Sequence, residues 1–155
     1  MKTNAMRLLR AAGISYTAKE YQVDESDLSA MHAVESLDIP AEQVFKTLVL
    51  QGASGAYAVC CIGAASELDL KKAARALGEK SIDLIPVKDI QRVTGYIRGG
   101  CSPIGMKKQY PTFIDETAQL FDAIAINAGE RGMLLTLTPE ELARFIGAEF
   151  ADLTD

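Results

Sequence analysis

One lysine stands inside an apolar run where an apolar side chain is expected. Lys46 lies in the run from Val44 to Leu50, and on a strand it shares a face with Val44, Leu48 and Leu50. A charge on a buried face is costly unless it is paired or used. The alternative is a purely structural role: a lysine at a sheet edge, where its side chain reaches water and deters aggregation. Lys46 is therefore a candidate functional residue.

A glycine-rich loop is the second candidate. The stretch from Gly95 to Gly105 holds four glycines and one proline. Glycines let backbone N–H groups approach a ligand closely, which suits a carbonyl oxygen or a phosphate. Gly100 and Gly105 have Walker A spacing, but Met106 intervenes before the lysine, and this excludes a P-loop. The alternative is a tight structural turn.

Other reactive side chains form no recognisable constellation. Cys101 lies in the glycine loop, but a thiol nucleophile needs a base, and the chain's single histidine, His32, is distant in a predicted helix. Asp115 and Glu116 follow a predicted strand and could exchange protons. The simpler interpretation is that these two carboxylates begin the next turn or helix.

The charge balance limits how the chain could hold RNA. The net charge is −5, and the 16 Lys and Arg residues are scattered, with only Lys71-Lys72 and Lys107-Lys108 adjacent. Proteins that bind nucleic acid unaided usually carry a basic face. We therefore expect any RNA contact to be small and local, or shared with a partner.

The three cysteines predict neither a disulfide nor a metal site. Cys60 and Cys61 are neighbours, so on a strand they point to opposite faces, and one histidine cannot complete a zinc site with them. Reduced thiols indicate a reducing cytosol. No secretory signal and no apolar run of membrane-spanning length is recognisable, so we expect a cytoplasmic protein that binds no membrane.

These residues belong to one predicted α+β domain spanning 1–155, with a mixed sheet. The clearest strand, 44–50, forms a hairpin with 56–62, and Ser66 is expected to cap a helix that ends at Gly78. Thr138, Pro139 and Glu141 are a strong helix start. Further strands are predicted at 14–21, 82–85, 112–115, 123–127 and 133–137, and further helices at 4–12, 29–37 and 87–93.

The chain also resembles a known family in several blocks that occur in one order over nearly its whole length. The blocks are Val44-Phe45-Lys46-Thr47-Leu48, Leu68-Asp69-Leu70-Lys71-Lys72, Thr94-Gly95-Tyr96, Gly99-Gly100-Cys101-Ser102-Pro103-Ile104-Gly105 and Ile114-Asp115. They are similar to the signature of the YbaK/EbsC proteins, stand-alone relatives of the editing domain of bacterial prolyl-tRNA synthetases. The resemblance implies a mixed, partly barrel-like sheet surrounded by helices.

The implied activity is removal of wrongly attached amino acids from tRNA, chiefly cysteine from tRNA(Pro), without a cofactor or a protein nucleophile. The family's essential lysine maps onto Lys46, which would hold the terminal adenosine and its phosphate. Tyr21 would orient the aminoacyl group, and the backbone of Gly99 would lie against the ester carbonyl. The remaining implied substrate-binding residues are Thr47, Gly100, Ser102 and Asn127. The implied partners are the 3′ aminoacyl end of mischarged tRNA and prolyl-tRNA synthetase, and DNA is not among them.

Three positions depart from the YbaK branch of this family. Asn127 replaces a serine, Leu134 replaces an aspartate, and Ser29 or Ala30 replaces a pocket phenylalanine. Loss of a polar pocket group could shift the preference from cysteine to another small residue such as alanine. A tRNA-binding or regulatory module without catalysis, of the EbsC type, is the alternative from another class.

Overall fold

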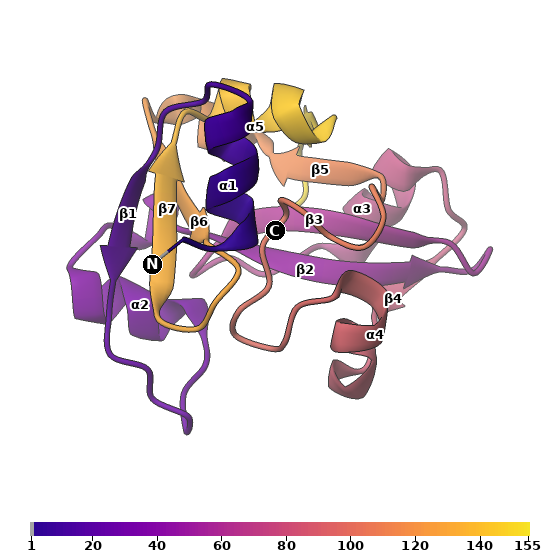
Figure 1. Cartoon of the computed structure of the whole chain (residues 1–155). Coiled ribbons are helices and arrows are strands. Elements are labelled where there is room, and N and C mark those ends of the chain that lie inside the picture. The colour runs from indigo at the N-terminus through magenta and orange to yellow at the C-terminus, as the bar shows by residue number, and fades with distance from the viewer. Residues whose placement is uncertain (1) are drawn as a thin grey trace.

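Two β-sheets joined at one point form the centre of the computed structural model, which describes residues 2–155 (Figure 1). The larger sheet has the strand order β4-β2-β3-β5-β8 and the smaller has the order β1-β7-β6. A single parallel bridge between Val44 and Ala125 links them. The strands are β1 (Thr17–Glu20), β2 (Phe45–Gly52), β3 (Tyr57–Gly63), β4 (Ile82–Leu84), β5 (Thr112–Asp115), β6 (Ile124–Asn127), β7 (Met133–Leu137) and β8 (Glu149–Ala151).

The larger sheet is mixed, as the sequence predicts. β2 and β3 form an antiparallel hairpin, whereas β3 pairs with β5, and β5 with β8, in parallel. The α+β class is confirmed, and the sheets do not close into a barrel. On its other edge β2 pairs with β4 only from Leu50 to Gly52. The first half of β2 therefore has an edge that β4 leaves open.

Helices cover both sheets (Figure 1). The main core lies between the sheets and is closed by α1 and α5, while α3 packs on the other face of the larger sheet and α2 against the smaller one. The helices are α1 (Asn4–Ala11), α2 (Ala30–Leu37), α3 (Leu70–Leu77), α4 (Ile90–Thr94) and α5 (Pro139–Ile146), with 3-10 turns η1 (Ala41–Gln43), η2 (Val87–Asp89) and η3 (Glu116–Leu120). Within residues 2–155, each helix is too short or too polar to cross a membrane.

Two helix starts were predicted, and one of them is wrong. α5 begins as expected, because the Thr138 hydroxyl accepts a hydrogen bond from the Glu141 N–H at 3.3 Å. α3 is capped by Asp69 rather than Ser66: the Asp69 carboxylate accepts from the N–H groups of Lys71 and Lys72. The bridge between Leu68 and Thr154 keeps the chain extended up to this point, so the helix cannot begin earlier.

Strand boundaries differ from the predicted ones at the edges of the sheets. The strand predicted from Ile14 to Tyr21 forms only over Thr17–Glu20, where every residue is exposed and no buried face extends the pairing. The short strand β8 was not predicted, because its three residues pair only with β5. Asp115 caps η3 through its bond from the Thr117 N–H and also accepts from the Leu153 N–H, which confirms its structural role.

Candidate active site

A cavity of about 300 Å³ lies at the open edge of β2. It is bounded by α2 and the end of β6 on one side, and by β4, α4 and the glycine loop on the other. Five of the seven site residues that the family resemblance implies line it: Tyr21, Lys46, Thr47, Gly99 and Asn127. The fold thus brings together residues that are up to 106 positions apart.

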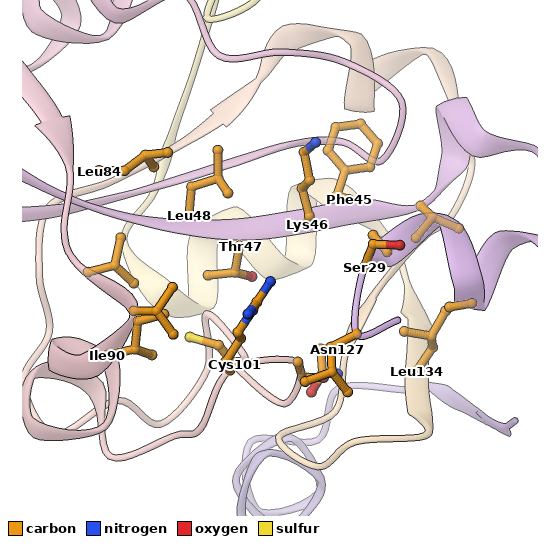
Figure 2. Close-up of a pocket in the computed structure, with 18 of the residues that line it drawn as sticks. Ser29, Phe45, Lys46, Thr47, Leu48, Leu84, Ile90, Cys101, Asn127 and Leu134 are labelled. Atoms are coloured by element: carbon orange, nitrogen blue, oxygen red, sulfur yellow. The ribbon is translucent and has the colours of Figure 1, made fainter. Parts of the chain in front are cut away.

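Lys46 extends from β2 on the face that it shares with Leu48, opposite to Thr47 (Figure 2). Its ammonium is half-buried and donates to the carbonyl oxygen of Ala64 at 3.2 Å. No carboxylate within residues 2–155 lies within 4.0 Å of it. Burial lowers the pKa of Lys46, and the more distant charge of Glu67 partly opposes that shift. The amine therefore keeps hydrogen-bonding capacity for a ligand.

Thr47 contributes to the cavity from the other face of the same strand. Its side chain lies toward Cys101 in Figure 2, and its hydroxyl is 4.0 Å from the Cys61 sulfur. Because neighbouring side chains of a strand point to opposite faces, the cavity can contact both Lys46 and Thr47 only by extending around the open edge of β2. The main chain at Thr47 therefore borders the cavity as well.

The glycine loop is held against β6 by hydrogen bonds. Gly99 has a φ of 83°, which favours glycine, and a Cβ there would lie 3.1 Å from the Leu28 Cβ. The Asn127 amide donates to the Gly99 carbonyl oxygen at 3.0 Å, while its own oxygen accepts from the Gly129 N–H at 2.6 Å. The Arg131 Nε donates to the Arg98 carbonyl oxygen at 2.9 Å. These contacts fix the loop at the cavity.

Gly100 and Ser102 do not line this cavity, and both are buried within the loop. A Cβ at Gly100 would lie 3.1 Å from the backbone nitrogen of Arg131. The Ser102 hydroxyl accepts from the Ile104 N–H at 3.1 Å. Their positions support the shape of the loop, which is a role distinct from the direct substrate contact that the resemblance implies.

Tyr21 lies just after β1, one residue beyond the strand, and its N–H donates to the Gly132 carbonyl oxygen at 2.9 Å. Burial raises the pKa of its phenol. Its ring packs edge-on against His32 with 5.8 Å between the centroids. Tyr21 is therefore a neutral hydroxyl held in place at the α2 side of the cavity.

Cys101 is a weak candidate for a nucleophile. Burial raises the pKa of its thiol to about 11, so the thiolate is scarce at neutral pH. His32 lines a smaller neighbouring cavity, and its Nε2 is 2.8 Å from the carbonyl oxygen of Gln22. Within residues 2–155 no hydrogen bond joins the two, and no three His, Cys, Asp or Glu side chains gather as a metal site.

Several cavity residues escaped the sequence analysis. Arg98 lines the cavity from the glycine loop, and Leu84, Val87 and Ile90 form an apolar wall beside it. Leu84 and Val87 are 50% and 53% exposed. Large apolar side chains exposed together indicate a binding surface, but their exposure cannot be recognised from the sequence alone. All the positions that depart from the YbaK branch, Ser29, Ala30, Asn127 and Leu134, also line the cavity.

Residues 25–145 match the family model described as "Aminoacyl-tRNA editing domain". The chain is 46% identical over 153 residues to a protein of Enterococcus faecalis named "Putative Cys-tRNA(Pro)/Cys-tRNA(Cys) deacylase EbsC". That alignment covers 99% of this chain and 93% of the relative.

Solved structures with the same fold include one titled "Crystal structure of a putative trans-editing enzyme for prolyl tRNA synthetase". It is 24% identical, with a TM-score of 0.81, and the match covers 100% of this chain and 99% of the other. The crystal structure of a hypothetical protein, APE2540, is 20% identical with a TM-score of 0.87, over 96% and 97% of the two chains.

Proposed function

This chain belongs to the aminoacyl-tRNA editing domain family, and we propose that it is a trans-acting deacylase that clears mischarged tRNA, with Cys-tRNA(Pro) as its main substrate. The observation that carries the proposal is the convergence of Tyr21, Lys46, Thr47, Gly99 and Asn127 on one cavity at the open edge of β2. The extensive identity to a relative named as a cysteinyl-tRNA deacylase supports the choice of substrate.

In this proposal Lys46 contacts the terminal nucleotide, and the loop at Gly99 faces the ester carbonyl. Within residues 2–155 the Lys46 ammonium donates to one acceptor, the Ala64 carbonyl oxygen, and it can donate further to a phosphate or ribose oxygen. The Gly99 N–H has no hydrogen-bond acceptor within residues 2–155 and can donate to the carbonyl oxygen as negative charge develops there. The carbonyl of the same peptide unit, that of Arg98, accepts from the Arg131 Nε at 2.9 Å, and the Asn127 amide holds the next carbonyl, that of Gly99. Both bonds position this donor before the reaction begins.

For cysteine the attacking group is supplied by the substrate. Its thiol sulfur forms a bond to the ester carbonyl carbon, the bond from that carbon to the ribose 3′ oxygen breaks, and the thiol proton ends on the released hydroxyl. The amino acid leaves as a cyclic thiolactone, which water then opens. Positioning and carbonyl polarisation are the protein's contributions, which agrees with the high pKa of Cys101.

The aminoacyl side chain would lie toward α2. There the lining consists of Ala33, Val44 and Leu134, with Tyr21 and Ser29 beside them. This small apolar space fits the sulfanylmethyl side chain of cysteine or the methyl side chain of alanine. It offers little to separate them, because one group of that size is worth only about 1–3 kcal/mol of discrimination. Alanine on tRNA(Pro) is therefore the second candidate substrate, favoured by Leu134 at the position of the family's aspartate.

Prolyl-tRNA synthetase is the partner that we propose, because that enzyme forms the mischarged product and already holds its tRNA. A charged 3′ end passed between two proteins in contact is subject to a raised effective concentration. The proposed substrate places the reaction in the cytoplasm, where tRNA is charged.

The test is a deacylation screen of the purified protein against tRNA(Pro) charged with Cys, Ala, Ser or Pro. We expect rapid loss of cysteine and retention of proline. Clearance of alanine with cysteine left intact would keep the enzyme class and change the substrate. Failure to clear any of the four, while the protein still binds tRNA(Pro), would instead support a binding or regulatory module.

A further inference from the structure

Charge is distributed very unevenly on the two sides of the cavity. Residues 86–110, called here the basic segment, carry five cations, Lys88, Arg92, Arg98, Lys107 and Lys108, against the single carboxylate of Asp89. Residues 20–38, called the acidic segment, carry six carboxylates and no Lys or Arg. The chain's net charge of −5 therefore conceals a positive side.

Both segments form walls of the same cavity. The basic segment contributes Val87, Ile90, Arg98 and Cys101, and it consists of η2, α4 and the glycine loop that follows them (Figures 1 and 2). The acidic segment contributes Tyr21, Leu28, Ser29, Ala30 and Ala33. A charged ligand entering between them experiences a field directed across the opening.

The cations of the basic segment are available to a ligand. Lys88, Arg92, Arg98, Lys107 and Lys108 are all exposed. Within residues 2–155 the ion pairs are those of Arg92 with Asp89, at 3.4 Å, and of Lys72 with Asp152. The four other cations of the segment therefore have no carboxylate partner.

The segment is also held as one surface. The Lys107 ammonium donates to the Arg92 carbonyl oxygen at 3.2 Å, which joins the end of the loop to α4. The Tyr110 hydroxyl donates to the Val93 carbonyl oxygen at 2.7 Å. A surface whose backbone is already positioned loses less entropy when it binds a polyanion.

We propose that the basic segment is the docking surface for the phosphates of the tRNA acceptor end, and that the substrate therefore enters the cavity from the α4 side with its aminoacyl group toward α2. The inference rests on the proposed function and specifies the direction of binding. RNA is the occupant because four cations without a carboxylate partner within residues 2–155 belong to the segment whose Arg98 lines the cavity of about 300 Å³. The aminoacyl ammonium then points to the acidic segment, whereas the reverse orientation would point the phosphates toward the segment that carries six carboxylates.

The experiment compares two charge-reversal variants with equal changes of net charge. Lys88→Glu/Lys108→Glu alters two exposed side chains of the basic segment that make no side-chain hydrogen bond within residues 2–155. Arg75→Glu/Lys80→Glu alters two exposed cations on and just after α3, which packs on the face of the larger sheet opposite to α4. The dissociation constant of uncharged tRNA(Pro) is measured for each between about 50 and 200 mM salt.

We expect the Lys88/Lys108 variant to bind at least about 10-fold more weakly at 150 mM salt, with the slope of log K against log salt reduced by about 1.4–1.8, since each phosphate contact contributes about 0.7–0.9. The Arg75/Lys80 variant is expected to stay within about threefold of wild type. Equal losses in the two variants, or none in either, would overturn the proposal. So would unchanged tRNA binding combined with lost binding to prolyl-tRNA synthetase, which would make the surface a protein contact.

A second measurement separates this inference from the proposed function. A cysteinyl ester of adenosine has no acceptor-stem phosphates, so the Lys88/Lys108 variant should cleave it at the wild-type rate while losing activity on whole tRNA. A loss on the short ester as large as that on whole tRNA would refute the docking surface. If wild type cleaves neither substrate but binds tRNA through Lys88 and Lys108, the proposed activity fails and the docking surface stands.

Discussion

Asn127→Asp is a nearly isosteric change that separates the two hydrogen bonds of Asn127. The aspartate keeps an oxygen to accept from the Gly129 N–H, at 2.6 Å in the native protein, but loses the donor to the Gly99 carbonyl oxygen, at 3.0 Å. A lost hydrogen bond costs about 0.5–1.5 kcal/mol, and an anionic oxygen facing a carbonyl oxygen adds repulsion. We therefore expect the free energy of unfolding to fall by about 1–2 kcal/mol.

The loop at Gly99 should then be less well positioned, which affects the chemical step more than binding. A loss of about 1–2 kcal/mol in transition-state stabilisation corresponds to a rate reduced about 5- to 30-fold. The assay is single-turnover deacylation of Cys-tRNA(Pro) at saturating enzyme, alongside urea unfolding. Asn4→Asp, at the chain's only other asparagine, is the control and should retain the wild-type rate. An Asn127→Asp protein that deacylates within twofold of wild type would refute the role of this amide in holding the loop.

Two further predictions concern Cys101. Cys101→Ala should retain deacylation within about threefold, and near-complete loss of activity in a folded Cys101→Ala protein would revive a protein nucleophile. At pH 8 iodoacetamide should modify Cys101 about 100-fold more slowly than a thiol with the ordinary pKa of 9.0, because burial raises the pKa of Cys101 to about 11. The same shift predicts alkaline sensitivity: a folded-state pKa above the unfolded one contributes stability that is fully present below about pH 9 and is lost as the pH rises toward 11, at about 1 kcal/mol per pH unit near pH 10. Urea unfolding from pH 8.5 to 10.5 checks this, since Cys101→Ala should lose less stability over that range, and an identical slope in both proteins would contradict it.

The strongest sequence prediction of the fold is the hairpin around Lys46. Its β-branched and apolar residues form β2 and β3, and the lysine stands out because a charge is costly on that face. The helix start at Thr138 is confirmed for a similar reason, since its capping contacts are local. By contrast, Asp69 was not recognised as the cap of α3, because the chain is kept extended before it by the distant Thr154.

The candidate site was only partly visible in the sequence, because its assembly depends on contacts between distant segments. The Asn127 amide holds a loop 28 residues earlier in the chain, and nothing in the sequence indicates that its side chain binds Gly99 rather than only substrate. Arg98 was not selected, although it is the only cation between Gly95 and Gly105, because its place at the cavity depends on the fold of the loop. The cations of residues 86–110 were judged scattered for the same reason.

Single-turnover deacylation of Cys-tRNA(Pro) by Lys46→Ala tests the account most directly. Among the residues that the structure describes, the native ammonium has one acceptor and no ion pair, so the protein loses little when it is removed. A charged contact to substrate, by contrast, is worth about 2–3 kcal/mol. We expect the rate to fall about 30- to 150-fold with an unchanged urea midpoint, while Lys19→Ala, at an exposed lysine of β1, deacylates as wild type does. A Lys46→Ala protein that clears cysteine within about threefold of the wild-type rate would contradict the assignment of this cavity as the deacylation site.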